Sequence, residues 1–259
     1  MNLPVEVIDA VRAGRCLVFV GTRASMEAAE LADEAYPDAA ALAKELGWKR
    51  PKVPMGGKQR GVIASVAEGA AEYESAHGRA ALVARLGERV GAPVAPTEAH
   101  RVVMGRFPVV FTTALDDLLE RASTLPVDVI ERGARVPDPV PDRRVLVKIR
   151  GGFDRPDTLV LTPADSARKP LSVDAKKQLR GLIRNHVVLF VGYRPDEEEF
   201  ESLFAELSDA WGGELPRCHL SVAQGPIDDF LWQKWVWRGL LMFTADPVEC
   251  MHELQASVA

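Results

Sequence analysis

The sequence predicts an α/β fold in which helices cover both faces of a parallel sheet. Short apolar runs such as Cys16–Val20 and Val187–Val191 are continuous rather than alternating, which is typical of strands buried on both faces. Helical stretches separate most of these runs, and this alternation favours parallel strands connected by helices. The predicted strands are Cys16–Val20, Val109–Thr113, Val127–Ile130, Val145–Ile149, Leu159–Leu161, Val187–Val191, His219–Val222 and Leu240–Thr244.

Residues 26–96 differ in character from the rest of the chain. They are rich in Ala, Glu, Leu and Arg and show no clear strand pattern. Two helical blocks are predicted, and Pro37 is expected to break the first, because proline lacks the backbone donor and clashes with the preceding turn. The blocks span Ala28–Leu46 and Val62–Val90. We therefore predict a helical module over 26–96, inserted into a sheet domain formed by 1–25 and 97–259.

The composition is that of an ordinary soluble protein. The chain has 259 residues, 47% of them hydrophobic, and a net charge of −5, whereas nucleic-acid binders are usually strongly basic. Its apolar runs are too short to span a bilayer, and its start lacks the pattern of a secretory signal. The three cysteines form no CxxC pair, so neither a disulfide framework nor a zinc site is expected. We expect a cytoplasmic protein without membrane or nucleic-acid partners.

The first predicted strand ends in a loop that could hold phosphate. Gly21 follows Val20, and small residues up to Ser25 lead into a helix. A glycine lets the backbone approach a ligand, and a helix N-terminus offers free N–H groups. The loop has a single glycine, so these residues alone favour an ordinary turn with Ser25 as helix cap over a phosphate site.

Four segments, in order along the chain, resemble the sirtuin-like family. They are His100–Glu120 with its TTALDDLLE end, Val147–Gly152 followed by Pro156–Thr162, Val188–Tyr193, and Trp232–Phe243. The resemblance is to the bacterial branch that carries a helical module in place of a zinc ribbon. It implies a Rossmann-like sheet, NAD or ADP-ribose as ligand, no zinc, and assembly as a homo-oligomer or with a partner protein.

Sirtuin-like enzymes bind NAD across the carboxyl ends of their strands. The resemblance implies cofactor contacts at Gly21, Thr22, Arg23, Ser25, Thr112, Thr113, Asp116, Arg150, Gly151 and Gly192. Arg23 replaces the second glycine of the family's first loop. Its guanidinium could pair with a pyrophosphate, or its bulk could fill the ligand's place.

The two reactive positions of the family are both changed. Ala114 stands where the family has asparagine, and a methyl group cannot hydrogen-bond a ribose hydroxyl or a water molecule. Arg150 stands where the family has its catalytic histidine, and arginine stays protonated and cannot act as a base. No catalytic residue is therefore predicted, and the usual NAD cleavage is expected to be lost.

Three functions stay open. The first is a degenerate, non-catalytic protein that binds NAD, ADP-ribose or a related nucleotide, or serves as a scaffold or regulatory subunit, in antiphage defence by resemblance to bacterial relatives. The second is an active NAD hydrolase of an antiphage system, in which Asp116 or His186 replaces the missing base. The third is a pure protein-interaction subunit with a plugged pocket.

Other polar residues have simpler interpretations. His100 is expected to be buried or to cap its helix, and Glu120 to face solvent or pair locally. The acidic run Asp196–Glu199 suits the first turn of a helix, and it would repel an anionic ligand nearby. Phe230 and the tryptophans at 232, 235 and 237 are expected to pack in the core or between subunits.

Overall fold

The computed structural model describes residues 3–32, 36–49, 65–91, 94–213, 215, 218–222 and 227–258. Residues 62–64, with which the second predicted helical block begins, lie outside these ranges. No helix within them is long and apolar enough to cross a membrane.

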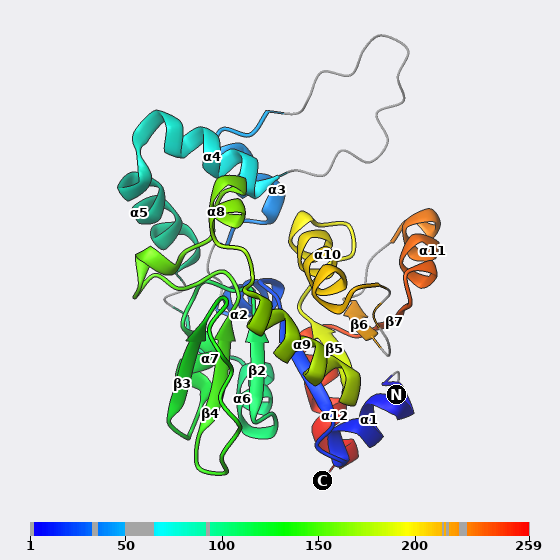
Figure 1. Cartoon of the computed structure of the whole chain (residues 1–259). Helices are drawn as coiled ribbons and strands as arrows, with labels where there is room; N and C mark the ends of the chain where they lie inside the picture. The colour runs from blue at the N-terminus through cyan, green and yellow to red at the C-terminus, as the bar shows by residue number, and fades with distance from the viewer. Residues whose placement is uncertain are drawn as a thin grey trace.

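The described residues form one sheet of seven strands, in the order β3-β4-β2-β1-β5-β6-β7. Every neighbouring pair runs parallel, so the predicted parallel α/β fold is confirmed (Figure 1). The order reverses at β1, whose neighbours are β2 and β5, and ligands of such sheets bind at the strand ends beside such a reversal. The strands are β1 Cys16–Val20, β2 Val109–Thr112, β3 Val127–Glu131, β4 Arg144–Lys148, β5 Val187–Val191, β6 Cys218–Val222 and β7 Leu240–Thr244.

Helices cover both faces of this sheet because successive strand residues point to opposite sides. Val18 and Val110 join a core with helices α1, α6 and α12. Phe19 and Phe111 point the other way, into a core with α9, α10 and α11. The helices are α1 Val5–Arg12, α2 Arg23–Leu31, α3 Ala39–Glu45, α4 Val66–His77, α5 Arg79–Val90, α6 Glu98–Arg106, α7 Leu118–Ala122, α8 Pro163–Arg168, α9 Val173–Asn185, α10 Glu198–Trp211, α11 Asp229–Trp237 and α12 Pro247–Val258.

The described residues between β1 and β2 form helices and no strand. Pro37 lies between α2 and α3, as predicted. The second predicted block is two helices, because Gly78 takes a φ of +86° between α4 and α5. Figure 1 shows α3, α4 and α5 together beyond one end of the sheet, beside α8. The division into a module at 26–96 and a domain at 1–25 and 97–259 stays a prediction.

One predicted strand is wrong. Leu159–Leu161 is buried but belongs to no strand. Leu159 and Leu161 pack instead against Leu82 and Leu86 of α5, and Val160 N donates to the carbonyl of Arg150 at 3.0 Å. A short apolar run indicates burial in either case, and here the helices rather than a neighbouring strand supply the contact.

Candidate functional site

The candidate site lies at the carboxyl ends of β1 and β5, where Gly21 and Gly192 follow their strands. Their loops are bonded together: Gly21 N donates to Val191 O at 2.9 Å, and Arg23 N to Gly192 O at 3.0 Å. A Cβ atom on Gly21 would lie 2.3 Å from Gly192 O and 2.6 Å from the ring of Tyr193. The absence of a side chain at Gly21 is therefore required by the protein's own neighbouring loop. A bound ligand is not needed to explain it.

The carboxylate of Glu199, in α10, accepts hydrogen bonds from the loop that was predicted to bind phosphate. It accepts from Thr22 Oγ1 at 2.7 Å, from Thr22 N at 3.4 Å and from Thr113 Oγ1 at 2.5 Å. The hydroxyl of Tyr193 lies 3.0 Å from Thr113 Oγ1. A carboxylate only accepts hydrogen bonds, so the Thr113 proton goes to Glu199 and Tyr193 donates to Thr113. A negative group of the protein itself thus sits where the loop would hold an anion.

Arg23 is also occupied by α10. Its Nη1 lies 3.3 Å from Oε1 of Glu197, and both side chains are largely buried. Burial raises the pKa of Glu197 to about 7, and the neighbouring Glu199 adds to the rise while Arg23 opposes it. The guanidinium predicted to meet a pyrophosphate therefore has a carboxylate as its partner.

Ser25 and Asp116 form a buried pair beneath the loop. Ser25 Oγ donates to Asp116 Oδ2 at 2.6 Å, and Leu118 N donates to Asp116 Oδ1 at 3.1 Å. Burial raises the pKa of this carboxyl, while its hydrogen bonds oppose the rise. Ser25 lies inside α2 and does not cap it, because Thr22 is the residue before the helix. Asp116 instead joins α2 to the start of α7.

Lys148 is buried and forms an ion pair with Glu120, so the prediction for Glu120 was wrong. Its Nζ donates to Asp116 O at 2.6 Å and lies 2.7 Å from Glu120 Oε1. Glu120, expected to face solvent or pair locally, is thus the partner of a buried lysine 28 positions away. Burial raises the pKa of Glu120 and the ion pair opposes the rise.

Thr112 and Ala114 stabilise the end of β2. Thr112 Oγ1 donates to Val20 O at 2.9 Å and accepts from Ala114 N at 3.0 Å. Ala114 is buried. These contacts hold β1 and β2 together and do not depend on a ligand.

Arg150 stands at the junction of two hollows. One, of about 120 Å³, is lined by Thr22, Thr113 and the acidic turn of α10. The other, of about 320 Å³, extends toward Ser202, and Arg150 and Thr113 line both. Arg150 Nη2 donates to Ser202 Oγ at 2.8 Å. Arg150, which the resemblance aligns with the family's histidine, therefore borders both hollows.

Gly151, the next predicted contact, is fixed by its own loop. It has a φ of +77°, and a Cβ atom there would lie 2.5 Å from Thr158 Oγ1. Of the predicted contacts, Thr22, Thr113 and Arg150 line the two hollows, and most donors of the predicted contacts are already bonded within the protein.

The smaller hollow is apolar with an acidic edge. Met26, Tyr36 and Leu115 contribute to its apolar wall, while Glu197, Glu198 and Glu199 line it beside Arg150. Glu198 accepts from Ser65 Oγ at 2.8 Å, which ties α10 to the start of α4. Because Arg23 pairs with Glu197, two further carboxylates face the single guanidinium of Arg150, and this excess of negative charge disfavours a phosphate group in the hollow.

The histidines take no part in the crevice. His100 is buried, and its Nδ1 accepts from Thr97 N at 3.2 Å, as its predicted capping role requires. Burial lowers its pKa to about 4. His186 directly precedes β5, at the opposite end of that strand from Gly192, so it cannot replace the missing base. The described residues contain no cluster of three or more metal-ligating side chains.

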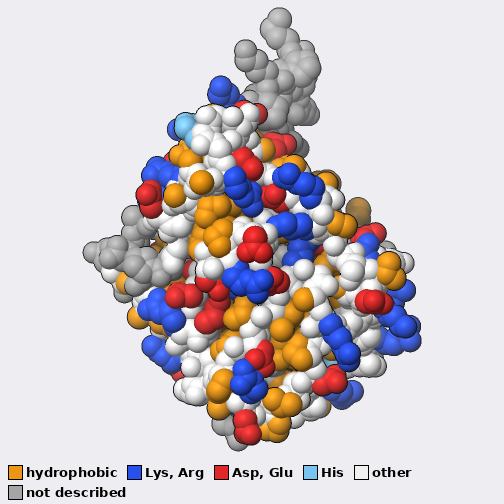
Figure 2. Space-filling model, turned by 60° about the vertical axis from the view of Figure 1, so that its left-hand side comes forward, with side chains coloured by type: hydrophobic (Ala, Val, Ile, Leu, Met, Phe, Trp, Pro, Cys, Tyr) orange, Lys and Arg blue, Asp and Glu red, His pale blue; other side chains and the backbone are white. Residues whose placement is uncertain are grey.

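Figure 2 shows how charge is distributed over one face of the molecule. Basic and acidic side chains are interspersed there, with hydrophobic side chains between them. This face does not present the continuous basic surface that binds a nucleic-acid backbone.

Sequence reasoning missed Glu199 and Tyr193 as parts of the site. It identified the acidic run only as a helix start near the crevice. One signal in the sequence could have identified Glu199. Thr22, Thr113 and Glu199 each lie in a segment that follows a predicted strand. The carboxyl ends of parallel strands meet at one edge of the sheet, so these residues are expected near one another.

Comparisons with known protein families and with solved structures both give matches to Sir2-like proteins. The family model described as SIR2-like domain matches residues 108–236. A crystal structure of a Sir2 homolog–NAD complex is 13% identical with a TM-score of 0.56, and the match covers 99% of this chain and 94% of that one. Two Sir2 homologue mutants in complex with ADP-ribose are also 13% identical, with TM-scores of 0.53 and 0.54 and coverage of 99% and 96%. No curated protein sequence matches. At this identity the structural likeness is one of fold.

Proposed function

We propose, from the premise that this chain contains a sirtuin-like domain, that it is a binding or regulatory protein which does not cleave NAD. NAD, ADP-ribose or a related nucleotide is the proposed ligand class, because the similar solved structures are complexes with NAD and ADP-ribose. The observation that carries the proposal is the carboxylate of Glu199 on the donors of Thr22 and Thr113.

The chemistry of the crevice supports a loss of cleavage. Arg150 stays protonated and cannot take a proton from a ribose hydroxyl. Asp116 is 5% exposed, and both of its carboxylate oxygens accept hydrogen bonds from Ser25 and Leu118. Neither residue is therefore available as the base of an NAD hydrolase.

Nucleotide binding requires the first turn of α10 to move. A pyrophosphate at the β1 loop would compete with Glu199 for Thr22 and Thr113, and with Glu197 for Arg23. The carboxylates of Glu197 and Glu199 would also repel the negative charge of the pyrophosphate. We propose that binding and displacement of this turn are coupled, which would let a nucleotide report its presence to a partner.

Purified protein mixed with NAD tests the loss of cleavage. We expect no nicotinamide release above buffer. Thermal-shift titration with NAD and with ADP-ribose tests binding, and Glu199→Gln should bind at least about tenfold more tightly than wild type, about 1.4 kcal/mol, because a repulsive charge is removed. Glu201→Gln is the matched control, since Glu201 lies on the same helix and pairs with Lys234.

A clear turnover of NAD by the wild-type protein would overturn the proposal in favour of an active hydrolase. The nucleotide part would be lost if millimolar NAD and ADP-ribose stabilised neither wild type nor Glu199→Gln. The second candidate, an interaction subunit with a plugged pocket, would then hold. It is favoured by the buried side chain of Tyr193, whose ring would lie 2.6 Å from a Cβ atom on Gly21. A place in antiphage defence and in the cytoplasm rests on the resemblance and composition and remains a prediction.

A further inference from the structure

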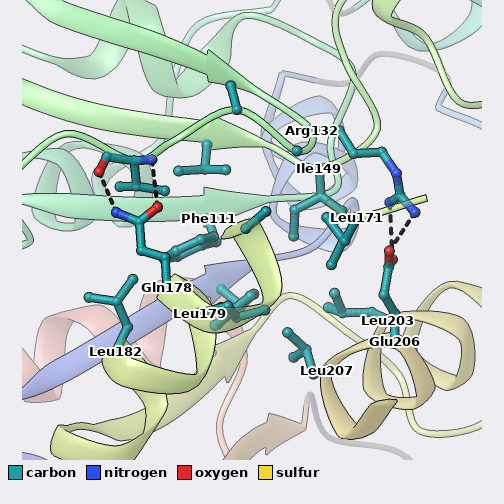
Figure 3. A pocket seen from close by; sticks show the side chains of 16 residues that line it. Phe111, Arg132, Ile149, Leu171, Gln178, Leu179, Leu182, Leu203, Glu206 and Leu207 are labelled. Carbon is teal, nitrogen blue, oxygen red and sulfur yellow. Dashed lines mark hydrogen bonds and ion pairs between the residues drawn. The ribbon is translucent and has the colours of Figure 1, made fainter. Parts of the chain in front are cut away.

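The acidic side chains of α10 fall into two groups. Those from Glu201 onward each pair with a cation, as Figure 3 shows for Glu206 and Arg132, which line a separate apolar cavity of about 60 Å³. Among the described residues, Glu198 and Glu199 at the start of the helix have no cationic partner, although both accept hydrogen bonds. The remaining pairs are Glu201 with Lys234 and Asp209 with Lys176.

Neutral donors hold the carboxylates of Glu198 and Glu199. Glu198 accepts from Ser65 Oγ, and Glu199 accepts from the hydroxyls of Thr22 and Thr113. None of these donors carries a positive charge, and the positive end of the helix dipole compensates only part of the charge of two carboxylates. Both side chains line the smaller hollow, whose walls are otherwise mainly apolar. Charges in such surroundings are normally paired, because apolar walls solvate them poorly.

Arg150 does not cancel this negative charge. It borders the smaller hollow, but its Nη2 donates to Ser202 Oγ at 2.8 Å, and Ser202 lines only the larger hollow of about 320 Å³. In the part of the chain that the structure describes, no ion pair joins Arg150 to Glu198 or Glu199. The other nearby guanidinium, that of Arg23, pairs with Glu197. The smaller hollow therefore keeps an excess of negative charge.

Tyr36 adds a polar atom without a partner to the same hollow. Its side chain is largely buried and lines the hollow, and its hydroxyl forms no hydrogen bond within the described ranges. Burial raises the pKa of this phenol well above its ordinary value, and the charges of Asp116 and Glu199 add to the rise. The hydroxyl is therefore neutral and lies within the field of these carboxylates. A phenol oxygen can accept a hydrogen bond from a cation, and the face of its ring attracts one.

We propose that the smaller hollow binds a small primary ammonium ion with an apolar tail of about four carbons. The ammonium group lies among the carboxylates of Glu198 and Glu199 and the hydroxyl of Tyr36, and the tail packs against Leu42 and Leu86. The hollow measures about 120 Å³, whereas a cavity of about 150 Å³ holds benzene, so about five non-hydrogen atoms fit. The ammonium binds without a nucleotide, so this site does not rest on the proposed function.

Calorimetric titration of the full chain with butylammonium tests this site. At pH 8 a primary amine is still protonated, and Glu197, whose pKa burial raises to about 7, is mostly ionised. 1-Butanol has the same number of non-hydrogen atoms without the charge, and methylammonium has the charge without the tail. Butylammonium should bind at least tenfold more tightly than either. Equal affinity for butylammonium and 1-butanol would overturn the proposal.

Variants of the hollow locate the bound ion. Glu199→Gln should weaken butylammonium binding at least tenfold, and Glu201→Gln should leave it unchanged, because Glu201 already pairs with Lys234. Tyr36→Phe should weaken butylammonium but not 1-butanol, since only the ammonium uses the hydroxyl. Ala39→Leu, which fills the hollow from the start of α3, should abolish binding, whereas Ala40→Leu on the exposed side of α3 should retain it. Undiminished binding to folded Glu199→Gln and Ala39→Leu proteins would contradict the assignment.

A competition experiment connects this site to the proposed nucleotide crevice, and this arm alone rests on the proposed function. An ammonium ion beside Glu199 holds its carboxylate on Thr22 and Thr113, so saturating butylammonium should weaken ADP-ribose binding. By linkage, ADP-ribose should weaken butylammonium binding by the same factor. Tighter ADP-ribose binding in the presence of butylammonium would contradict the placement of the ion. Absence of ADP-ribose binding in every protein would remove the nucleotide proposal and leave the direct titrations valid, so the two proposals can fail independently.

Discussion

At the scale of single residues, Glu197 links the crevice to pH. Its pKa is raised from 4.5 to about 7, first by burial and then by Glu199. Between pH 4.5 and about pH 7, the Glu197 carboxyl is protonated in the folded protein but ionised in the unfolded chain. The stability contributed by Glu197 is therefore full below about pH 4.5 and is lost as the pH rises through 7.

Glu197→Gln should remove this pH dependence. The midpoint of thermal unfolding of the variant, relative to wild type, should increase from pH 5 to about pH 7 and level off by about pH 8, because glutamine carries no charge to bury. Glu27, whose pKa is also raised to about 7, titrates in both proteins and cancels in the difference. Glu72→Gln, on the exposed side of α4, should show no such trend. A constant difference between Glu197→Gln and wild type across this range would contradict the assignment.

The resemblance assigns the family's two reactive positions to Ala114 and Arg150, which stays a prediction, and it did not identify Glu199 as part of the site. Arg150 and Thr113 could be placed because each lies next to a recognisable strand end. Glu199 could not, since it contacts Thr22 across 177 positions of sequence. This contact depends on the position of α10 relative to the carboxyl ends of the strands, and that position is not determined by any local sequence pattern.

At the scale of elements, strands were easier to predict than helix limits. A strand buried on both faces must be apolar throughout, so β1 and β5 agree with prediction to the residue. The same logic failed for Leu159–Leu161, because burial alone does not distinguish a strand from a buried loop. Gly78 was missed as a helix boundary because a glycine in a helical pattern does not reveal its own φ.

Gly78 offers a test of this boundary. It has a φ of +86° and a ψ of +163°, a region that only glycine adopts readily, so Gly78→Ala should destabilise the fold by about 1–3 kcal/mol. Gly181→Ala is the matched control, because Gly181 lies inside α9 with open space around it. That change should stabilise by about 0.5–1 kcal/mol. Urea denaturation measures both, and equal effects would refute the strained boundary.

At the scale of the whole molecule, one edge of the sheet exposes apolar side chains. Trp235 packs in the core as expected, but Phe230 and Trp237 of α11 are 75% and 77% exposed. Leu241 of the edge strand β7 is 52% exposed. Exposed apolar residues gathered on neighbouring elements indicate an interaction surface, and α11 packs against β7.

We therefore expect the purified protein to be a homo-oligomer or to copurify with a partner. Light scattering after size exclusion should give a mass above 28.3 kDa, and Phe230→Ser with Trp237→Ser should lower it to that of a monomer. Val173→Ser, at an 83% exposed apolar residue of α9, should leave the mass unchanged. A wild-type monomer without any bound partner would contradict this expectation.

The central place of β1 has a consequence for biosynthesis. Cys16 pairs with Val187 in β5, so one neighbour of this apolar strand emerges from the ribosome only after about 170 further residues. At typical synthesis rates of about 5–20 residues per second, that delay is roughly 10–30 s. During this interval β1 lacks half of its final hydrogen-bonded surroundings. The nascent chain must therefore shield an aggregation-prone segment, a task suited to chaperones or to early docking on β2.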